Sequence, residues 1–123
     1  MRVVLCFLIS LLAAPAWAEW ILVEDDGDMV VYFNPATTQK NDQFRRVLAV
    51  QDLKQKGKDG EMSRQILMEY DCKEQRSRTL STATHSEPMA GGKTLLSNDY
   101  YGRWTAVVAG TDSSVPLKYV CAQ

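Results

Sequence analysis

The chain has 123 residues, 14 basic and 15 acidic side chains, and a formal net charge of −1. This balance gives no indication of a nucleic-acid partner, which would be expected to leave an excess of basic residues. The length suits a single domain preceded by a short leader.

The N-terminus has the three-part pattern of a secretory signal peptide. Arg2 provides a positive start, residues 3–14 form an apolar run broken only by Ser10, and Ala16-Trp17-Ala18 supplies small residues for cleavage. The apolar run is shorter than the roughly 20 residues needed to cross a bilayer, which disfavours an uncleaved anchor. We therefore expect a signal peptide over residues 1–18, a single exported domain over 19–123, and no later transmembrane segment.

Cleavage at this position would also leave two of the three cysteines in the exported domain. Cys6 leaves with the signal peptide, while Cys72 and Cys121 remain in the exported domain. Two cysteines in an oxidising compartment are best interpreted as one disulfide, although two buried free thiols are the alternative. Closing a loop of this length stabilises a chain by roughly 4 kcal/mol in the chain-entropy model.

The exported part opens with a predicted β-hairpin. Residues 19–24 and 29–33 are β-prone runs, and the Asp-Gly pair ending at Gly27 lies between them. Glycine adopts a positive φ without steric cost, so this pair favours a tight turn. Asn34-Pro35 predicts the end of the second strand, because proline has no backbone N–H to donate.

Two further strands are expected over residues 44–53 and 62–72, with a polar loop over 54–60 between them. The second of these alternates apolar Ile66, Met68, Tyr70 and Cys72 with polar Gln65, Glu69 and Asp71. A period of two predicts a strand with one face in water, and it directs Cys72 toward the core.

The remaining elements are a strand over 76–86, a short strand over 103–108 and a helix over 114–121, while residues 93–101 stay ambiguous. Asp112 to Ser114 offer N-cap chemistry for the helix, and Pro116 is tolerated in its first turn. Val115 with Tyr119 and Leu117 with Cys121 suggest a buried stripe. The predicted fold class is α+β: an antiparallel sheet of about six strands, with a short C-terminal helix attached by the disulfide.

Several short motifs occur in an order that matches a known family. They are AEWILVEDDG at 18–27, Tyr32-Phe33-Asn34-Pro35, Glu69-Tyr70-Asp71-Cys72-Lys73-Glu74 followed by Arg76, Pro88-Met89, Trp104, and Lys118-Tyr119-Val120-Cys121. On these residues the chain resembles the surface-adhesin protein E-like family of small exported proteins from Gram-negative bacteria. The resemblance implies a sheet of about six strands packed with helix, a place in the periplasm or at the cell surface, and, for some members, binding of host matrix proteins. It brings no catalytic motif.

Two groups of residues are candidates for binding. Tyr100 and Tyr101 lie beside polar residues and a glycine, so we expect them to be exposed, whereas Trp20 and Trp104 are expected in the core. The basic candidates are Arg45, Lys73, Arg76 and Arg78, with Arg46, Lys54, Lys56 and Lys58 nearby. On neighbouring strands such residues form a patch suited to an acidic glycan, lipopolysaccharide or an acidic protein segment. Acidic residues are interleaved with them, however, which favours an ordinary surface of mixed charge over such a patch.

Other chemistry finds little support. Residues 92–94 resemble the end of a phosphate-binding loop, but Glu87 occupies the position of the required glycine. His85 is the only histidine and lacks a ligand set, so we expect a surface residue near a strand end. The aspartates of the 25–28 turn lack calcium-loop spacing. We expect no cofactor, no metal site and no enzymatic activity.

The leading hypothesis is a non-enzymatic cell-envelope protein that contacts an extracellular-matrix protein or an acidic glycan through a sheet face or edge. The alternative is a periplasmic structural or accessory protein with no host partner. An enzyme is a third, disfavoured class, because several convergent polar groups in a cleft would be required. An open sheet has edges to cover, which also favours a homodimer.

Overall fold

The computed structural model of the protein describes residues 19–123, and the predicted signal peptide at 1–18 lies outside them. The elements in chain order are β1 Ile21–Asp25, β2 Met29–Asn41, β3 Phe44–Leu53, β4 Ser63–Asp71, β5 Arg76–Glu87, β6 Gly91–Asp99, β7 Thr105–Ala106 and α1 Ser114–Cys121. Within the described part of the chain, no helix is long and apolar enough to cross a membrane.

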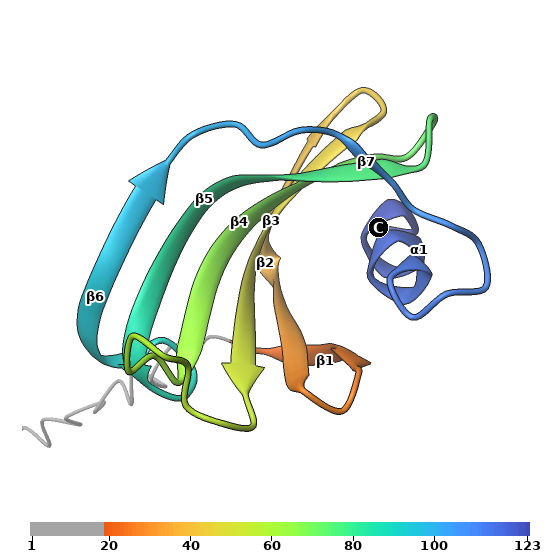
Figure 1. The fold of residues 1–123 in the computed structure, drawn as a ribbon. Helices are drawn as coiled ribbons and strands as arrows, with labels where there is room; N and C mark the ends of the chain where they lie inside the picture. Colours follow the sequence, from red (N-terminus) through yellow and green to blue (C-terminus); the bar gives the residue numbers. More distant parts are fainter. Residues whose placement is uncertain (1–18) are drawn as a thin grey trace, which may run out of the picture.

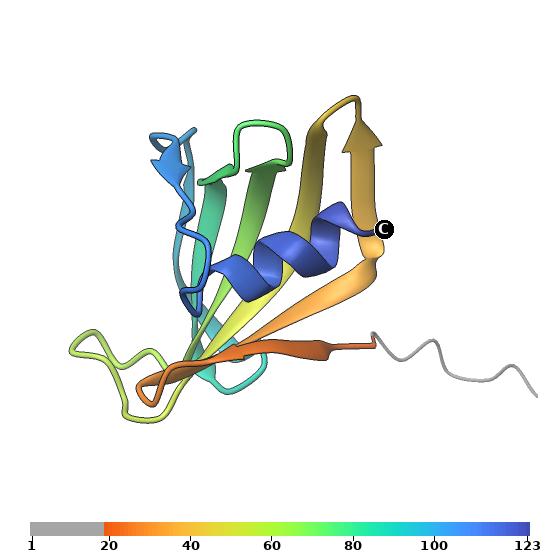
Figure 2. The ribbon, with the colours of Figure 1, turned by 90° about the vertical axis from the view of Figure 1, so that its right-hand side faces the viewer.

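The seven strands form one antiparallel sheet. Strands β1 to β6 follow one another in sequence order, and β7 pairs with β5. Figure 1 shows the long strands arching over α1, and Figure 2 shows α1 lying across one side of the sheet. We call the side that carries α1 the inner face and the opposite side the outer face. Mostly antiparallel sheet with one helix agrees with the predicted architecture.

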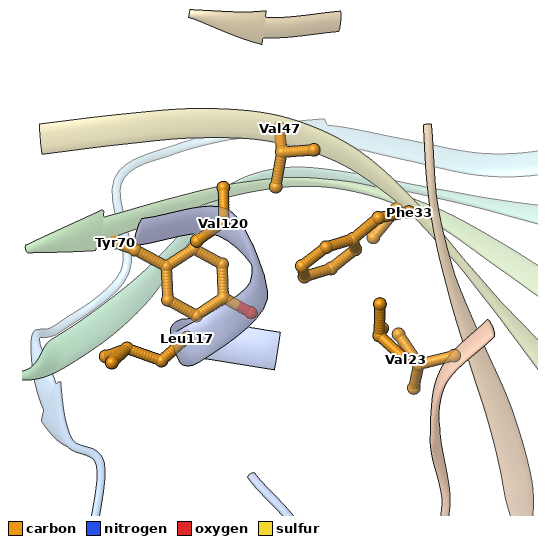
Figure 3. Packing of buried hydrophobic residues seen from close by; sticks show 8 residues of the cluster. Val23, Phe33, Val47, Tyr70, Leu117 and Val120 are labelled. Atoms are coloured by element: carbon orange, nitrogen blue, oxygen red, sulfur yellow. The ribbon is translucent and has the colours of Figure 1, made fainter. Parts of the chain in front are cut away.

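The hydrophobic core lies between the inner face and α1. Phe33, Val47 and Val120 are fully buried at its centre, and Figure 3 shows them converging from two strands and the helix. The rest of the cluster is Val23, Val31, Ala49, Tyr70 and Leu117. Side chains of this size stabilise a fold by about 1.5–3 kcal/mol each when fully buried.

The buried stripe of α1 differs from the predicted one. Pro116, Leu117 and Val120 are buried, whereas Val115 is 51% exposed. Leu117 and Val120 are three residues apart, a spacing that also shares a helix face. Ser113 occupies the N-cap position but makes no side-chain capping bond.

The Cys72–Cys121 disulfide joins the end of α1 to the turn that follows β4. The two Cα atoms are 5.7 Å apart across a sequence separation of 49 residues. The predicted pairing is therefore confirmed, and the bridge holds the helix against the inner face.

Strand β2 corrects the prediction that Asn34-Pro35 ends the second strand. It continues to Asn41, but its ladder with β3 is interrupted between Asn34 and Gln39. Pro35 falls inside this irregular stretch, where no ladder hydrogen bond is required of it. Proline within a sheet is confined to such bulges and edges.

The ambiguous stretch at 93–101 proves to be mostly strand, because β6 covers Gly91–Asp99. Eight of its nine residues are exposed, so neither face imposes an apolar period on the sequence. The strand expected over 103–108 is reduced to Thr105–Ala106, which pairs with Arg76 and Ser77 of β5.

Candidate binding face

The outer face carries two rows of mostly charged side chains at one end of the sheet. Because side chains alternate along a strand, residues paired across neighbouring strands point to the same face. The first row is Arg46, Glu69 and Arg78, and the second is Phe44, Asp71 and Arg76, on β3, β4 and β5 in turn. Basic and acidic groups thus alternate in the first row, and Asp71 lies between Phe44 and Arg76 in the second.

The segment after β6 brings two aromatic rings over these rows. It runs on along β5, where the Gly102 N–H donates to the Thr79 carbonyl at 2.8 Å. A Cβ at position 102 would lie 3.1 Å from that carbonyl oxygen, so glycine permits the close approach. The guanidinium carbon of Arg78 then lies 4.8 Å from the Tyr101 ring centre and 4.3 Å from that of Trp104.

The stacking extends to the other two arginines. The guanidinium carbon of Arg76 lies 4.5 Å from the Trp104 ring centre, and that of Arg46 lies 5.8 Å from the Tyr101 ring centre. Contacts of this kind contribute about 0.5–1 kcal/mol each at exposed sites. We call Arg46, Arg76, Arg78, Tyr101 and Trp104 the arginine–aromatic cluster.

Glu69 lies beneath the cluster and fixes two of its arginines. Its side chain is 6% exposed, and its two oxygens accept from Nε of Arg46 and Nε of Arg78, each at 2.8 Å. Nη2 of Arg78 adds a contact of 2.6 Å. Burial raises the pKa of Glu69, but the hydrogen bonds from Arg46 and Arg78 outweigh it and leave the pKa lowered. Glu69 therefore stays ionised at neutral pH.

Asp71 plays the same part for the second row. It is fully buried and accepts from Nε of Arg76 at 3.0 Å and from the backbone N–H groups of Lys73 and Glu74 at 3.1 Å. Burial raises its pKa, yet these bonds and one from Gln43 lower it overall. The prediction that Glu69 and Asp71 face water is wrong, because ion pairing compensates for their burial.

The cluster presents pre-arranged hydrogen-bond donors to solvent. The carboxylates hold the Nε edges of Arg46 and Arg76, whose side chains remain 39% and 38% exposed. Arg78 is 21% exposed. Planar guanidinium groups bind carboxylate, sulfate or phosphate through paired N–H donors. Because these groups are already ordered, binding them requires less loss of side-chain freedom.

A polar pocket of about 300 Å³ adjoins the cluster on the outer face. It lies over β3 to β6 and is lined by Leu48, Gln65, Leu67, Ser81, Thr82, Ala83, His85, Thr94, Ser97 and Asp99. His85 is only 9% exposed, which corrects the prediction of a surface histidine. Neither of its ring nitrogens has a hydrogen-bond partner among residues 19–123. The β5 strand continues past His85 to Glu87 and β6 lies beside it, which accounts for the burial.

The structure separates the predicted binding residues. Tyr101, Arg76 and Arg78 meet in the cluster, whereas Tyr100 lies beside it with 70% of its surface exposed. Lys73 is exposed in the turn after β4. Arg45 pairs with core residue Tyr70 and so lies on the inner face, donating to the carbonyls of Asp42 and Phe44.

The surroundings of Trp104 in the cluster and of Glu69 beneath it differ from those predicted from the sequence. Trp104 was expected in the core, but it is half-buried on the outer face against Phe44 and two arginines. Trp20 is also half-buried and lies outside the core cluster. The available signal was the spacing of Arg76 and Arg78, which places both side chains on one face of a strand.

Comparison with known families places this arrangement in context. A family model described as surface-adhesin protein E matches residues 20–122. The chain belongs to the surface-adhesin protein E family. A comparison with curated protein sequences gives no significant match.

Solved structures of Haemophilus influenzae protein E share the fold of this family member. One is 13% identical, covers 86% of each chain and superposes with a TM-score of 0.64. Another, from non-typeable Haemophilus influenzae, is 15% identical, covers 90% of this chain and 82% of that chain, and gives a TM-score of 0.62. Identity at this level shows a common fold and carries no residue roles across.

Proposed function

We propose that this family member is a non-enzymatic, adhesin-like protein of the cell envelope that binds an acidic glycan or an acidic segment of an extracellular-matrix protein. The observation that carries the proposal is the arginine–aromatic cluster, in which three partly exposed arginines are fixed by buried carboxylates and stacked on two rings. Membership of the surface-adhesin protein E family supports the same direction.

The cluster favours an acidic ligand with flat or apolar faces. Its exposed polar atoms are guanidinium donors, which match the oxygens of a carboxylate or sulfate group. Tyr101 is 61% exposed and offers a ring edge and face beside those donors. Tyrosine and arginine are enriched among the residues that dominate binding energy at interfaces.

Two substitutions test the cluster directly. Arg46→Gln and Tyr101→Ala are each expected to weaken binding to immobilised heparin or to a purified matrix protein by about tenfold, equivalent to about 1.4 kcal/mol. Surface plasmon resonance at several salt concentrations measures the affinity. The control is Lys54→Gln, which removes the same charge as Arg46→Gln. Lys54 is exposed, pairs with Asp25 and follows the end of β3 away from the cluster.

The Lys54→Gln control should bind within about twofold of the wild-type protein, a difference below about 0.5 kcal/mol. Circular dichroism should show all three variants folded. Equal affinity for wild type, Arg46→Gln and Tyr101→Ala would contradict the proposal that the cluster binds the ligand.

A homodimer is a further proposal for the free edge of the sheet. Strand β6 pairs with β5 on one side only and is exposed along its length, so a second copy can extend the sheet. Sedimentation equilibrium distinguishes a monomer from a dimer.

A further inference from the structure

The pocket beside the cluster contains polar groups that the fold does not use. The side chains of Gln65, Ser81, Ser97 and Asp99 belong to its polar lining. His85 is nine-tenths buried at the same place, and both of its ring nitrogens lack partners in the described chain. A buried polar group left without a partner costs about 1–3 kcal/mol, so the site is built with unused donors and acceptors.

The register of the strands places these groups on one face. Leu67 lies opposite Ser81, and Ser81 lies opposite Asp99. In the next row, Gln65 pairs with Ala83, and Ala83 pairs with Ser97. Leu48, Leu67 and Ala83 therefore provide an apolar floor among hydroxyl, amide, imidazole and carboxylate groups.

The charge of the pocket restricts its ligand. Among residues 19–123, Asp99 is the only charged residue that lines it, and no lysine or arginine of that range does. An anion placed there would meet a carboxylate with no compensating cation. A neutral ligand that carries several hydroxyls on one side and C–H groups on the other matches the lining. A volume of about 300 Å³ lies at the lower end of ligand pockets, which run from about 300 to 1,000 Å³.

We infer that the Gln65–Ser81–His85–Ser97–Asp99 pocket is a binding site for a neutral sugar residue. This inference deepens the proposed function, and it rests on that function for the wider ligand. The row of Arg46, Glu69 and Arg78 is two residues along β3 and β4 from the row of Leu48, Leu67 and Ser81, and three along β5, where the ladder has a bulge. Two residues of strand span about 7 Å. A glycan with a neutral unit beside an acidic unit can thus occupy the pocket and the cluster together.

Amide chemical shifts test the pocket without reference to the cluster. The exported protein, labelled with ¹⁵N, is titrated separately with N-acetylglucosamine, galactose and mannose. For at least one sugar, the backbone amides of Ser81, Ala83 and Ser97 should shift with a Kd on the order of millimolar, as expected for a small, open site. Absence of such shifts with all three sugars would overturn the inference.

Ser97→Trp and Asn98→Trp are a matched pair of variants. Ser97 lines the pocket, whereas Asn98 pairs with Thr82 and so points to the inner face. The two sites are adjacent and exposed on β6. Ser97→Trp should abolish the sugar-dependent shifts, and Asn98→Trp should retain them. Loss in both variants, or in neither, would contradict the site.

His85→Phe separates a ligand role from a structural one. Removing two unpartnered buried nitrogens should raise the melting temperature, while the sugar-dependent shifts should weaken several-fold. A fall in melting temperature would show that the imidazole already has a structural partner, which overturns its role here.

The two proposals fail in different ways. Loss of heparin binding in Arg46→Gln with sugar shifts intact supports the pocket and the cluster as adjoining parts. Sugar-dependent shifts without any binding to heparin or matrix protein would contradict the proposed function but would still support a sugar site in the pocket. Shifts at the same amides with a small amine, and none with the sugars, would assign the site to Asp99 and contradict a sugar site.

Discussion

At the residue scale, the decisive feature of the outer face is the burial of Glu69 and Asp71 beneath arginines. Both side chains are nearly inaccessible, and both have pKa values held below their usual range by hydrogen bonds that overcome burial. Such a pair of buried carboxylates is compatible with folding only while each keeps its partners. Their ionisation therefore links the stability of the fold to the geometry of the cluster.

This linkage predicts acid sensitivity. In the unfolded chain glutamate and aspartate titrate near pH 4.3 and 3.9, respectively, on model-peptide values. Because the folded pKa values lie lower, the unfolded state takes up protons first as the pH falls. The stabilisation should thus be complete at neutral pH and should decline once the pH drops below about 4.

Glu69→Gln isolates one part of this effect. At pH 7 it should lower the free energy of unfolding by about 1–3 kcal/mol, because a charged acceptor of two arginines is lost. The difference from wild type should shrink as the pH falls below about 4. Guanidinium chloride unfolding at a series of pH values measures it, with Glu74→Gln in the exposed turn as control. A difference independent of pH would contradict the account.

At the scale of elements, sequence patterns succeeded where one local cause dominates. Asp26-Gly27 determines a hairpin because Gly27 takes a φ of +93°, a conformation that costs glycine little. The alternation in β4 located the core residues Ile66 and Tyr70. The disulfide was also predicted correctly, since Cys72 and Cys121 allow only one pairing within residues 19–123.

Patterns failed where distant parts of the chain compensate for a local preference. Pro35 is accommodated in β2 because the ladder with β3 is interrupted there. No local sequence pattern predicts this interruption. The alternation in β4 predicts a solvent-facing Glu69. It cannot indicate the burial, because the partners Arg46 and Arg78 come from two other strands. The position of Trp104 depended on how the chain leaves β6, which the sequence does not specify.

The attachment of α1 to the sheet is the element-scale feature most open to test. Replacing Cys72 and Cys121 together by serine should lower the free energy of unfolding by about 2–5 kcal/mol, as for other small exported domains. Chemical unfolding of the variant, and of the wild type with and without reductant, measures the loss. The reduced wild type is the control and should match the double variant. A loss below about 0.5 kcal/mol would show that helix packing alone holds α1.

At the scale of the whole molecule, the two faces of the sheet carry different groups of residues. The core and α1 lie on the inner face, whereas the outer face holds the cluster and the pocket. Ligand contact therefore does not require the core to open. Variants at Arg46, Tyr101 and Ser97 can be judged by binding, and variants at the buried Glu69 or in the core by stability.

Location in the cell decides between the proposed adhesin-like protein and a periplasmic accessory protein without a host partner. If the first holds, protease added to intact bacteria should cleave the chain, with the exposed loop at residues 54–56 as an accessible site. A soluble periplasmic protein serves as the control and should stay intact. Protection until the outer membrane is opened would favour the accessory protein.

Cys121 lies near the C-terminal end of the chain, so a truncated chain cannot form the disulfide. All seven strands precede it in the chain, so the bridge and the helix that covers Phe33 and Val47 are added last. A copy cut short by a nonsense codon before α1 lacks both and leaves the inner face bare with one unpaired thiol. Exposed apolar surface and a free thiol are features by which proteases and thiol oxidoreductases select substrates. The bridge can therefore close only in a chain translated through to residue 121.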